Sequence, residues 1–434
     1  MNIPNTDKQR IVIVGGGFGG LQLAKELKDK NFQVVLIDKH NYHAFQPLFY
    51  QVATAGLEPG NIAYPLRKIF NSYTDYYFRM AELQEVIPSA NIIKTNIGDL
   101  HYDILVIATG ATTNYFGNQK MAQLCMPMKT VSEALNIRSL MLQNFERALL
   151  TDNQRERAAL MSAVLVGGGP TGVELAGALA ELKKDILPKD YPDLDIRQMG
   201  IHIIDAGDRL LSGMSPKSSE RALKDLRAMG VHVYLNKRVT DYDGQVITCH
   251  DGLQLHASLV IWSAGVKAAI PKGLPEECIQ FGRIAVDEYN AVKGLDNVYA
   301  VGDVAVMVSE EYPKGHPMLA QPALQQGKLL AKNIVRMRNG KERKPFKYKD
   351  LGSMATIGRN KAVAELTYTK IYGWLAWVAW LFVHVYQLIG FRNRISVLIS
   401  WAQNYFRHAR DLRLIIRPYH RQLDNPDEVK KDNL

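Results

Sequence analysis

Residues 10–30, with the sequence RIVIVGGGFGGLQLAKELKDK, join an apolar strand to a helix through a run of glycines. The glycines have the spacing Gly15-x-Gly17-x-x-Gly20, and the apolar residues after them recur with the period of a helix. In such a turn the first glycine bends the chain, the second lets the main chain approach a pyrophosphate, and the third lets helix and strand pack closely. The free N–H groups at the helix N-terminus also favour an anion. This stretch therefore predicts a dinucleotide-binding unit.

The same arrangement occurs again in residues 163–182, AVLVGGGPTGVELAGALAEL. After each copy another apolar strand ends in an acid, Asp38 in the first copy and Asp205 in the second, and an acid at this place can accept hydrogen bonds from a ribose. A lone glycine motif would be weak, but strand, turn, helix, strand and acid occur together twice. We therefore expect an α/β protein with two Rossmann-like dinucleotide-binding domains. The glycines of the second copy are Gly167, Gly169 and Gly172.

Asp205 bears on the choice of nicotinamide cofactor. A carboxylate at this place bonds the 2′-hydroxyl of NADH and repels the 2′-phosphate of NADPH, so we expect NADH. Two observations weaken this preference. Arg209 lies four residues later, and Asp205 follows Gly167 by 38 residues, which is further than the usual ~20.

Three further strands end in turns that contain glycine. Residues 101–112 contain Ala108-Thr109-Gly110, residues 258–265 end at Gly265, and residues 297–305 contain Gly302 and Asp303. Asp303 is either a group that bonds the ribityl chain or phosphate of a flavin, or an exposed acid in a turn.

Glu174 stands two residues after Gly172, in the first turn of the second predicted helix. In one interpretation it only stabilises the helix N-terminus, by ~0.3–1 kcal/mol. In the other, its carboxylate lies beside the nicotinamide and flavin rings. The residues alone leave both interpretations open.

Gln321 and Gln325 lie four residues apart in the segment 319–334, LAQPALQQGKLLAKNI, which is predicted to be helical from Ala323. At that spacing the two side chains can share one face of a helix. A pair of neutral amides beside a flavin could hydrogen-bond a quinone carbonyl without demanding a charge.

Length and composition narrow the classes of protein. A chain of 434 residues is expected to form two or three domains, and 47% hydrophobic residues exclude a disordered chain. Cys125, Cys249 and Cys278 are too far apart in sequence for a CxxC zinc module, and the stretch after the first glycine motif holds no cysteine. We therefore expect no metal site and no dithiol chemistry. The N-terminus lacks the apolar segment of a secretory signal, which favours a cytoplasmic compartment.

The C-terminal region is both apolar and basic. Residues 371–390 are almost wholly apolar and rich in tryptophan, and residues 395–406 have an apolar and a polar side. Eight cations and one acid between Lys370 and Arg421 carry most of the net charge of +10, and this combination favours an anionic lipid surface over nucleic acid. The length admits a transmembrane helix. The scattered tryptophans and the polar His384 and Gln387 instead favour two helices lying in the membrane interface.

Together these motifs resemble the type II NADH:quinone oxidoreductases, the single-subunit alternative NADH dehydrogenases. The resemblance covers about residues 10–415. It rests on GGGFGG, DKHNYH, ATG, GGGPTGVELAG, VGDVA, AQPALQQ and GFRNRISVLISWAQNYF, of which the AQxAxQ pattern is the most specific. Asp205 departs from the glutamate that we would expect at its strand tip.

The resemblance implies non-covalent FAD as cofactor, NADH as substrate and a membrane quinone as electron acceptor, without proton pumping. It also implies a functional role for Glu174 and a peripheral, monotopic position on the cytoplasmic face of the inner membrane, and it leaves room for a homodimer. The FAD-binding residues would be Gly15, Gly16, Gly17, Phe18, Gly19, Gly20, Asp38, Lys39, Ala108, Thr109, Gly110, Gly302, Asp303, Ala320 and Gln321. The NADH-binding residues would be Gly167, Gly169, Gly172, Glu174, Asp205 and Gly265, and Gln321 and Gln325 would face the quinone.

We accordingly expect an FAD-binding domain in two parts, 8–115 and 271–348, an NADH-binding domain of residues 116–270 inserted between them, and a membrane-anchoring region of residues 349–434. Three alternatives stay open. A sulfide:quinone oxidoreductase shares this fold but needs cysteines at the flavin and no NAD site. A reductase for a small iron protein would leave the C-terminal region unused. A flavin-bearing interaction protein would use NADH only as a switch.

Overall fold

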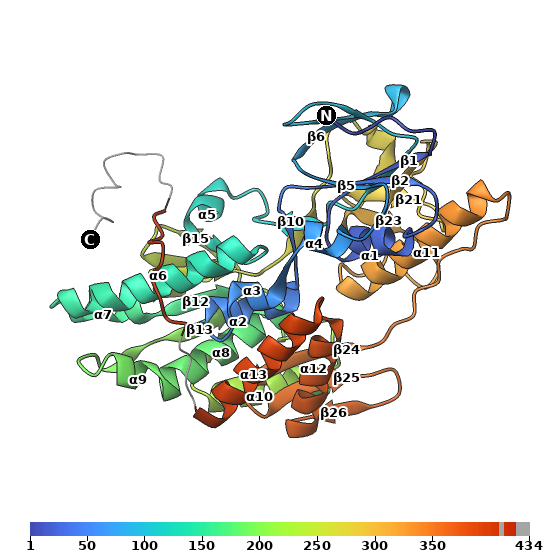
Figure 1. Ribbon diagram of the computed structural model, residues 1–434. Coiled ribbons are helices and arrows are strands. Elements are labelled where there is room, and N and C mark those ends of the chain that lie inside the picture. The colour runs from blue at the N-terminus through green and yellow to red at the C-terminus, as the bar shows by residue number, and fades with distance from the viewer. Residues whose placement is uncertain (408–411, 422–434) are drawn as a thin grey trace. The chain divides into compact units, whose positions relative to one another are not determined.

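The computed structural model describes residues 1–407 and 412–421, and the contacts within the chain divide it into two units (Figure 1). The first unit comprises Met1–Ala44, Tyr64–Thr112 and Lys267–Leu351. The second comprises Phe45–Ala63, Thr113–Val266 and the described residues from Gly352 onward. Each unit contains a parallel sheet and one of the two glycine motifs, which confirms the predicted α/β fold.

The unit boundaries differ from the predicted domains at two places. Residues 45–63 belong to the second unit, although the sequence places them in the first dinucleotide-binding domain. The described residues after Gly352 also belong to the second unit and do not stand apart as a separate region. Residues 408–411 and 422–434 of the predicted anchoring region lie outside the described residues.

The first unit is built on a parallel sheet with the strand order β22-β9-β1-β2-β5. Its strands are β1 (Arg10–Val14), β2 (Gln33–Asp38), β5 (Tyr76–Met80), β9 (Ile104–Ile107) and β22 (Val298–Ala300). The central strands are continuous runs of valine, isoleucine and leucine because both faces of the sheet are covered. Helix α1 (Phe18–Glu26) packs against α11 (Ala320–Arg338). Gly327 permits this close approach, since a Cβ there would lie 2.3 Å from the carbonyl oxygen of Gly19.

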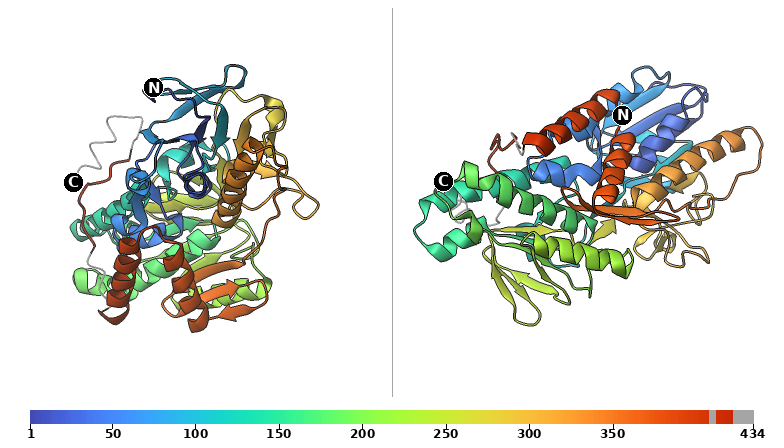
Figure 2. Two further views of the ribbon diagram at one scale, coloured as in Figure 1. Left: turned by 45° about the vertical axis from the view of Figure 1, so that its right-hand side comes forward. Right: turned by 90° about the horizontal axis from the view of Figure 1, so that it is seen from below.

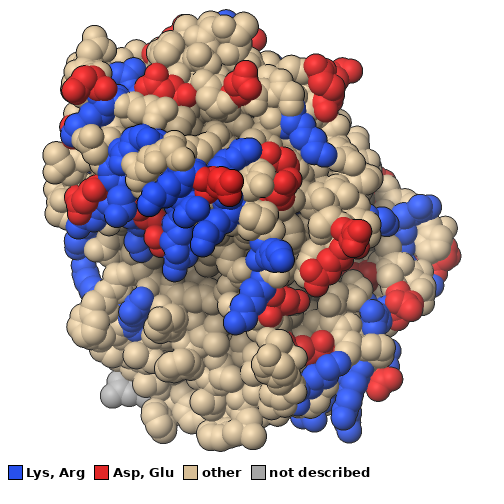
Figure 3. Space-filling view, turned by 90° about the vertical axis from the view of Figure 1, so that its right-hand side faces the viewer, with Lys and Arg blue, Asp and Glu red and all other residues tan. Residues whose placement is uncertain are grey.

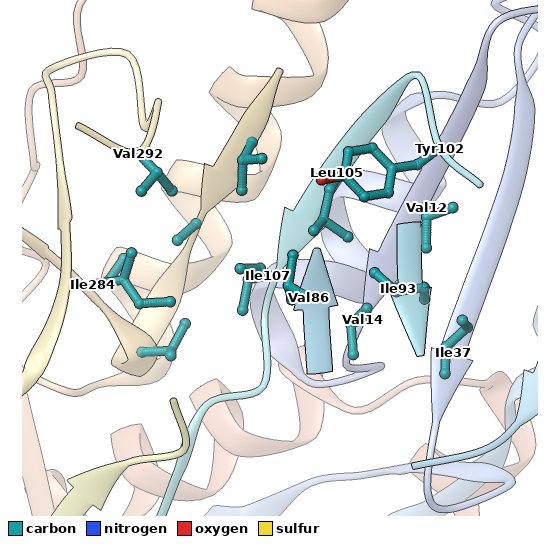
Figure 4. Packing of buried hydrophobic residues seen from close by; sticks show 14 of the residues in the cluster. Val12, Val14, Ile37, Val86, Ile93, Tyr102, Leu105, Ile107, Ile284 and Val292 are labelled. Atoms are coloured by element: carbon teal, nitrogen blue, oxygen red, sulfur yellow. The ribbon is translucent and has the colours of Figure 1, made fainter. Parts of the chain in front are cut away.

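An apolar core holds the first unit together (Figure 4). Val12 and Ile107 of the parallel sheet meet Val86 and Ile93 of a smaller antiparallel sheet, and Ile284 comes from a third sheet. The smaller sheets contain β6 (Leu83–Ile87), β7 (Ile92–Thr95) and β8 (Leu100–His101), and β20 (Ile279–Gln280), β21 (Arg283–Val286) and β23 (Ala305–Met307).

The second unit has a parallel sheet with the strand order β11-β18-β12-β13-β14. Helix α8 (Pro170–Asp185) begins directly after the second glycine turn, and α6 (Val131–Leu150) begins at a capping box formed by Thr130 and Glu133. The strands are β11 (Met126–Pro127), β12 (Ala163–Val166), β13 (Ile201–Ile204), β14 (His232–Tyr234) and β18 (Leu259–Trp262). A small antiparallel sheet contains β15 (Val239–Tyr242), β16 (Val246–Cys249) and β17 (Gln254–His256).

The C-terminal elements pack directly on α8 and α10 (Pro216–Ala228), which explains why they belong to the second unit. A Cβ at Gly177 of α8 would lie 1.9 Å from the carbonyl oxygen of Ile357, so this glycine lets α8 touch the C-terminal sheet. The carboxylate of Glu365 accepts hydrogen bonds from the hydroxyls of Ser215 and Ser218 at the start of α10. The C-terminal sheet contains β24 (Ser353–Gly358), β25 (Lys361–Glu365) and β26 (Lys370–Tyr372).

Two helices follow this sheet in the chain, α12 (Trp374–Gln387) and α13 (Phe391–Arg407). Figure 2 draws both helices in red. They match the two segments predicted from residues 371–390 and 395–406, with a turn at Gly390 where φ is +86°. Among the described residues, no helix combines the length and the apolar character needed to cross a membrane.

Residues 412–421 lie along the second unit. Arg413 pairs with Asp190, and the main chain of Tyr419 exchanges two hydrogen bonds with the amide of Gln143, at 2.8 and 3.2 Å. The guanidinium of Arg421 donates to the carbonyl oxygen of Ser258 at 2.5 Å. Arginines that the sequence assigns to a basic lipid-binding region therefore bond to the protein itself.

The remaining elements are short. The helices are α2 (Phe49–Ala53), α3 (Pro59–Ile62), α4 (Leu66–Phe70), α5 (Gln119–Leu124), α7 (Gln154–Met161) and α9 (Leu187–Asp190). The strands are β3 (Tyr42–Ala44), β4 (Ala63–Pro65), β10 (Ala111–Thr113) and β19 (Val266–Ala268).

Candidate functional site

The first glycine turn has the shape that a bound dinucleotide requires. Gly15 has φ +109°, and a Cβ there would lie 2.1 Å from the carbonyl oxygen of Ala108, so only glycine fits. A Cβ at Gly20 would lie 2.0 Å from the carbonyl oxygen of Gly15, whereas one at Gly17 would meet no protein atom within 4 Å. The turn is thus closed toward the sheet and open at Gly17. Helix α1 starts there without a side-chain cap, which leaves N–H groups for phosphate oxygens. These residues fit FAD.

Asp38 holds this turn against the end of β2. One carboxylate oxygen accepts the N–H of Gly16 at 2.6 Å, and the other accepts the N–H of His40 at 2.7 Å. A carboxylate has about four acceptor positions, so the remaining ones can accept ribose hydroxyls. Lys39 next to it is exposed.

His43 is a residue of this turn that the sequence argument missed. Its buried ring lies with Nδ1 2.9 Å from the carbonyl oxygen of Gly16 and packs edge-on against Phe18. Burial lowers the pKa of His43, so the neutral ring is the form that supports the turn. The signal in the sequence is the HNYH stretch directly after Lys39.

Two further predicted FAD-binding turns lie in the first unit. The hydroxyl of Thr109 donates to the carbonyl oxygen of Ala269 at 2.7 Å, and Gly110 has φ +70° with open space beside it. Gly302 has φ +75°, and its N–H donates to the side-chain oxygen of Gln326 at 2.7 Å. Gln326 is buried and was not singled out from the sequence. It connects the turn that holds Asp303 to helix α11.

The two glutamines of α11 have different surroundings. Both amide atoms of Gln325 are bonded to the main chain of Lys349, at 2.9 and 3.0 Å, so this side chain fixes the segment after the helix. Within the described part of the chain, the amide of Gln321 makes no hydrogen bond. Gln321 and Ala320 form the first turn of α11, which has no side-chain cap. Of the predicted pair, Gln321 is therefore the one with its amide available to a ligand.

The second glycine turn repeats the first. Gly167 has φ +114°, a Cβ at Gly172 would lie 2.0 Å from the carbonyl oxygen of Gly167, and a Cβ at Gly169 would meet nothing within 4 Å. Asp205 corresponds to Asp38, because its carboxylate accepts the N–H of Gly168 and, at 2.6 Å, the N–H of Gly207. The second turn thus has the same opening for a pyrophosphate.

Arg209 and Gly265 are two further residues that the sequence relates to the second turn. Arg209 donates to the carbonyl oxygen of Ser212 at 2.9 Å, which occupies one nitrogen of its guanidinium. Gly265 follows β18, and its carbonyl oxygen accepts the N–H of Asn114 at 3.0 Å. A Cβ at Gly265 would lie 3.2 Å from the exposed ring of Phe116.

Glu174 is buried in the second unit. It is the fifth residue of α8, and its carboxylate accepts the N–H of Thr356 of β24 at 3.4 Å. Burial raises the pKa of Glu174 to about 8, and the contacts with Thr356 and Trp380 oppose that rise only in part. A carboxyl that merely stabilised the helix N-terminus would be exposed and ionised. The structure therefore favours a protonated carboxyl that can exchange a proton near neutral pH.

An aromatic cavity of about 100 Å³ surrounds Glu174. Trp380 is 1% exposed, and its ring stacks on His384 with 3.9 Å between the centroids. Burial lowers the pKa of His384 to about 4, so this ring is neutral. Sequence reasoning placed His384 in a lipid-facing helix and missed the cavity. The cavity is lined by Tyr50, Gln51, Thr54, Gly56, Glu174, Ala178, Glu181, Thr356, Gly358, Arg359, Trp377, Trp380, Leu381, Trp401, Asn404 and Tyr405.

Comparison with known proteins gives two family matches. Residues 9–327 match the pyridine nucleotide-disulphide oxidoreductase family, and residues 351–411 match the NDH2 C-terminal domain. The chain is 35% identical over 419 residues to the type II NADH:quinone oxidoreductase Ndh of Mycobacterium tuberculosis, covering 93% of this chain and 89% of that protein. It is 36% identical over 421 residues to NdhA of the same organism, covering 93% and 88%. The fold is similar to that of NDH2 from Plasmodium falciparum in complex with NADH, with a TM-score of 0.86, 22% identity and coverage of 94% and 100%.

Proposed function

Because this chain belongs to the type II NADH:quinone oxidoreductases, we propose that it oxidises NADH and reduces a membrane quinone through bound FAD, without pumping protons. The observation that carries this function is the pair of matching glycine turns, one in each unit. Each turn is open at its second glycine, and in each an aspartate accepts main-chain N–H groups of the turn. Two dinucleotides therefore have two prepared sites.

We assign FAD to the first unit and NADH to the second. Bound FAD supplies the chemistry, since it can take a hydride from NADH and pass two electrons to a quinone. The turns that would hold it are those at Gly15–Gly20, Asp38, Ala108–Gly110 and Asp303, with Ala320 and Gln321 at the ring. The role of the protein is to orient the reactants and exclude water.

Two side chains are proposed to act on the quinone. The amide of Gln321 would donate a hydrogen bond to a quinone carbonyl, because it has no partner among the described residues. Glu174 would hold the proton that the quinone takes up, since its raised pKa keeps it protonated at neutral pH. Gln325 stays a prediction for the quinone site, although its amide already bonds Lys349.

The cysteines argue against sulfide chemistry. Cys125, Cys249 and Cys278 are all buried, and burial raises the pKa of each thiol, so none is poised as a thiolate nucleophile. A sulfide:quinone oxidoreductase would need reactive cysteines at the flavin. The second glycine turn, with Asp205, is also the proposed NADH site, for which such an enzyme has no use.

We further propose that the protein lies on a membrane without crossing it. The outer side of α12 exposes a stripe at four-residue intervals, Trp374, Val378, Phe382 and Tyr386. The polarity of α13 is the reverse of that of an ordinary surface helix. Asn393 and Asn404 on its inner side bond the main chain at Ala63 and Gly56. Its outer side carries Phe391, Ile395, Leu398, Ile399 and Phe406. An exposed apolar face of this kind is typical of an interfacial helix.

Charge is a weaker guide to the membrane side than these apolar faces. Lys and Arg also gather on the side of the molecule that includes α11, as Figure 3 shows, where residues 328–349 contain nine cations and one acid. In the C-terminal helices, Arg394 donates to the carbonyl oxygens of Tyr386 and Leu388, while Arg392 is exposed and would reach anionic lipid. We also propose that the protein lies on the cytoplasmic face of the inner membrane and can form a homodimer.

The test is turnover of NADH with a soluble quinone by the purified protein, with the released flavin identified. We expect FAD to be released on denaturation and NADH to be oxidised only when a quinone is present. A protein that binds both nucleotides without turnover would instead be an interaction protein. Transfer of electrons to a small iron protein but not to quinones would favour the reductase alternative.

A further inference from the structure

Helix α8 carries a second acid on the same side as Glu174. Glu181 follows it by seven residues, which is close to two turns and about 10 Å along the helix axis. Both carboxyl groups line the aromatic cavity, and so does Ala178, which lies between them on that face. The small side chain of Ala178 leaves the space between the two acids open.

The cavity between the acids is large and polar enough for water. Its volume of about 100 Å³ exceeds several times the ~10–15 Å³ that a single water needs. Polar groups of Thr356, Gln51 and Asn404 line it together with the two acids. Three waters spaced at a normal hydrogen-bond distance of ~2.8 Å would bridge roughly 10 Å.

Glu181 also borders a second, much wider pocket. This charged groove has a volume of about 1020 Å³ and is lined by Lys183, Lys184, Asp185, Asp195, Arg197 and Lys361, among others. Glu181 and Arg359 line both the groove and the cavity of Glu174. These two residues therefore form the wall that separates a polar groove from the buried carboxyl.

The hairpin between β24 and β25 holds Glu181 at this wall. The main-chain N–H of Arg359 donates to the carboxylate of Glu181, and the guanidinium of Arg359 reaches the carbonyl oxygen of Asn404 on α13 at 3.2 Å. The close packing of Gly177 on Ile357 fixes the hairpin against α8. The position of Glu181 is thus set by main-chain contacts and does not depend on a surface rotamer.

We propose that Glu181 and the cavity behind it, which has room for several waters, form a proton path from the groove to Glu174. This inference rests on the proposed function. Conversion of one NADH, one proton and one quinone to NAD⁺ and a quinol needs a proton from water in addition to the hydride. Glu174 gives its proton to an oxygen of the quinone as the quinone is reduced to the quinol, and its carboxylate regains a proton through the cavity from the side of Glu181.

The groups around the cavity are compatible with this direction of transfer. The titratable or charged groups that face it are Glu181 on α8 itself, Tyr50 from α2, Arg359 from the hairpin and Tyr405 from α13, with His384 of α12 stacked behind Trp380. His384 is neutral, and Arg359 is bonded to Asn404. Burial keeps Glu174 protonated up to a pH of about 8, so a proton is ready before the quinone arrives.

The first test uses Glu181→Gln, which keeps the size and the acceptor oxygen but cannot relay a proton. Asp185→Asn is the matched control, because Asp185 lines the groove but not the cavity. In stopped-flow experiments with the FAD-loaded enzyme, we expect NADH to reduce the flavin at the parent rate in both variants. Reoxidation by quinone should slow about tenfold or more in Glu181→Gln, since a positioned proton-transfer group typically contributes ~10²–10⁴-fold. It should also show a larger solvent isotope effect, while Asp185→Asn stays like the parent.

Rescue separates a proton path from a structural role. Glu181→Asp, or millimolar formic or acetic acid added to Glu181→Gln, should restore much of the reoxidation rate, because a carboxyl is again present. Ala178→Val, which narrows the space between the two acids, should slow the same step without changing any acid. Parent-like reoxidation in both Glu181→Gln and Ala178→Val would overturn the proposal, and so would equal slowing by Asp185→Asn.

An infrared measurement tests the path without turnover. The carbonyl band of the protonated Glu174 carboxyl, identified by its loss in Glu174→Gln, should shift on transfer to D₂O, and more slowly in Glu181→Gln than in the parent. Equal exchange rates would overturn the path while leaving the enzyme activity intact. Absence of NADH:quinone turnover in the parent would instead refute the proposed function, so the two failures can be distinguished.

Discussion

Replacement of Glu174 by glutamine should make the protein more stable than the parent at alkaline pH. Its pKa is ordinarily 4.5 and rises to about 8 in the folded protein because the group is buried. A raised carboxyl pKa has no effect on stability below the unfolded value. The resulting destabilisation grows as the pH rises from about 4.5 to about 8, and it is complete above that. At ~1.36 kcal/mol per unit, the full destabilisation is about 5 kcal/mol, and at pH 7 it is about 3 kcal/mol.

Glutamine at this position can still accept the N–H of Thr356. Its new amide donor is buried and costs about 1–3 kcal/mol if it finds no partner, but this cost does not change with pH. The stability difference between Glu174→Gln and the parent should therefore change by about 4 kcal/mol in favour of the variant between about pH 5 and about pH 9. The pH dependence is a better measure than the stability at any one pH.

Urea unfolding at several pH values measures this difference. The fluorescence of Trp377, Trp380 and Trp401 reports on the region around Glu174, because all three line its cavity. Glu220→Gln, an exposed acid on α10, serves as the control and should run parallel to the parent. Parallel pH profiles for Glu174→Gln and the parent would refute the burial argument. Faster quinone reduction by the variant would refute the role of the carboxyl in proton supply.

The other predictions concern substrate choice, the membrane and the quinone. Comparison of kcat/KM for NADH and NADPH should favour NADH, and Asp205→Asn should narrow the gap; equal values in the parent would contradict the role of Asp205. Deletion of residues 371–434 should release the protein from membranes. High salt should extract the intact chain only in part, because membrane binding through the exposed apolar faces of α12 and α13 does not depend on charge. Complete release by salt would contradict this prediction. Gln321→Leu should slow flavin reoxidation by quinone by about 2- to 10-fold, because a hydrogen bond of ~0.5–1.5 kcal/mol is lost. Flavin reduction by NADH should be unchanged, and slowed reduction would contradict a role of Gln321 toward the quinone alone. Gln325→Leu should lower the stability of the segment around Lys349, as measured by hydrogen exchange.

The glycine turns could be predicted from the sequence because their constraints are local. The positive φ of Gly15 and the contact between Gly20 and Gly15 arise within six residues, and the same holds for Gly167 and Gly172. The acid at each strand tip lies further along the sequence, but its place follows from the order strand, helix, strand, since β1 pairs with β2 and β12 pairs with β13 in the sheets. Such motifs carry most of their own geometry, although the carbonyl oxygen of Ala108 also excludes a side chain at Gly15.

The role of Glu174 could not be read in the same way. Its hydrogen-bond donor, Thr356, lies 182 residues later, and the choice between an exposed and a buried carboxyl depends on how β24 packs on α8. The surroundings of Gln325 also depend on a segment outside its own helix. Its spacing from Gln321 indicates a shared face, but Lys349 occupies its amide, and no periodicity within the helix can indicate that.

The sequence shows the amphipathic pattern of residues 395–406, but it does not show which side of the helix faces the protein. Asn393, Ser400 and Asn404 bond α13 to the rest of the second unit, so its apolar side faces outward. A hydrophobic pattern indicates that a segment is an amphipathic helix. The surface on which the helix packs decides which of its two sides faces the protein.

The contacts of residues 412–421 have a consequence for how the apolar helices meet a bilayer. The chain before α12 is held in the sheet by β26, and the chain after α13 is held by Arg413, Tyr419 and Arg421. A segment fixed on both sides has already lost most of the conformational entropy that a free amphipathic tail gives up when it orders on lipid. The two helices would therefore adsorb as a preformed surface, and a lateral pull on them would be transmitted to the rest of the second unit.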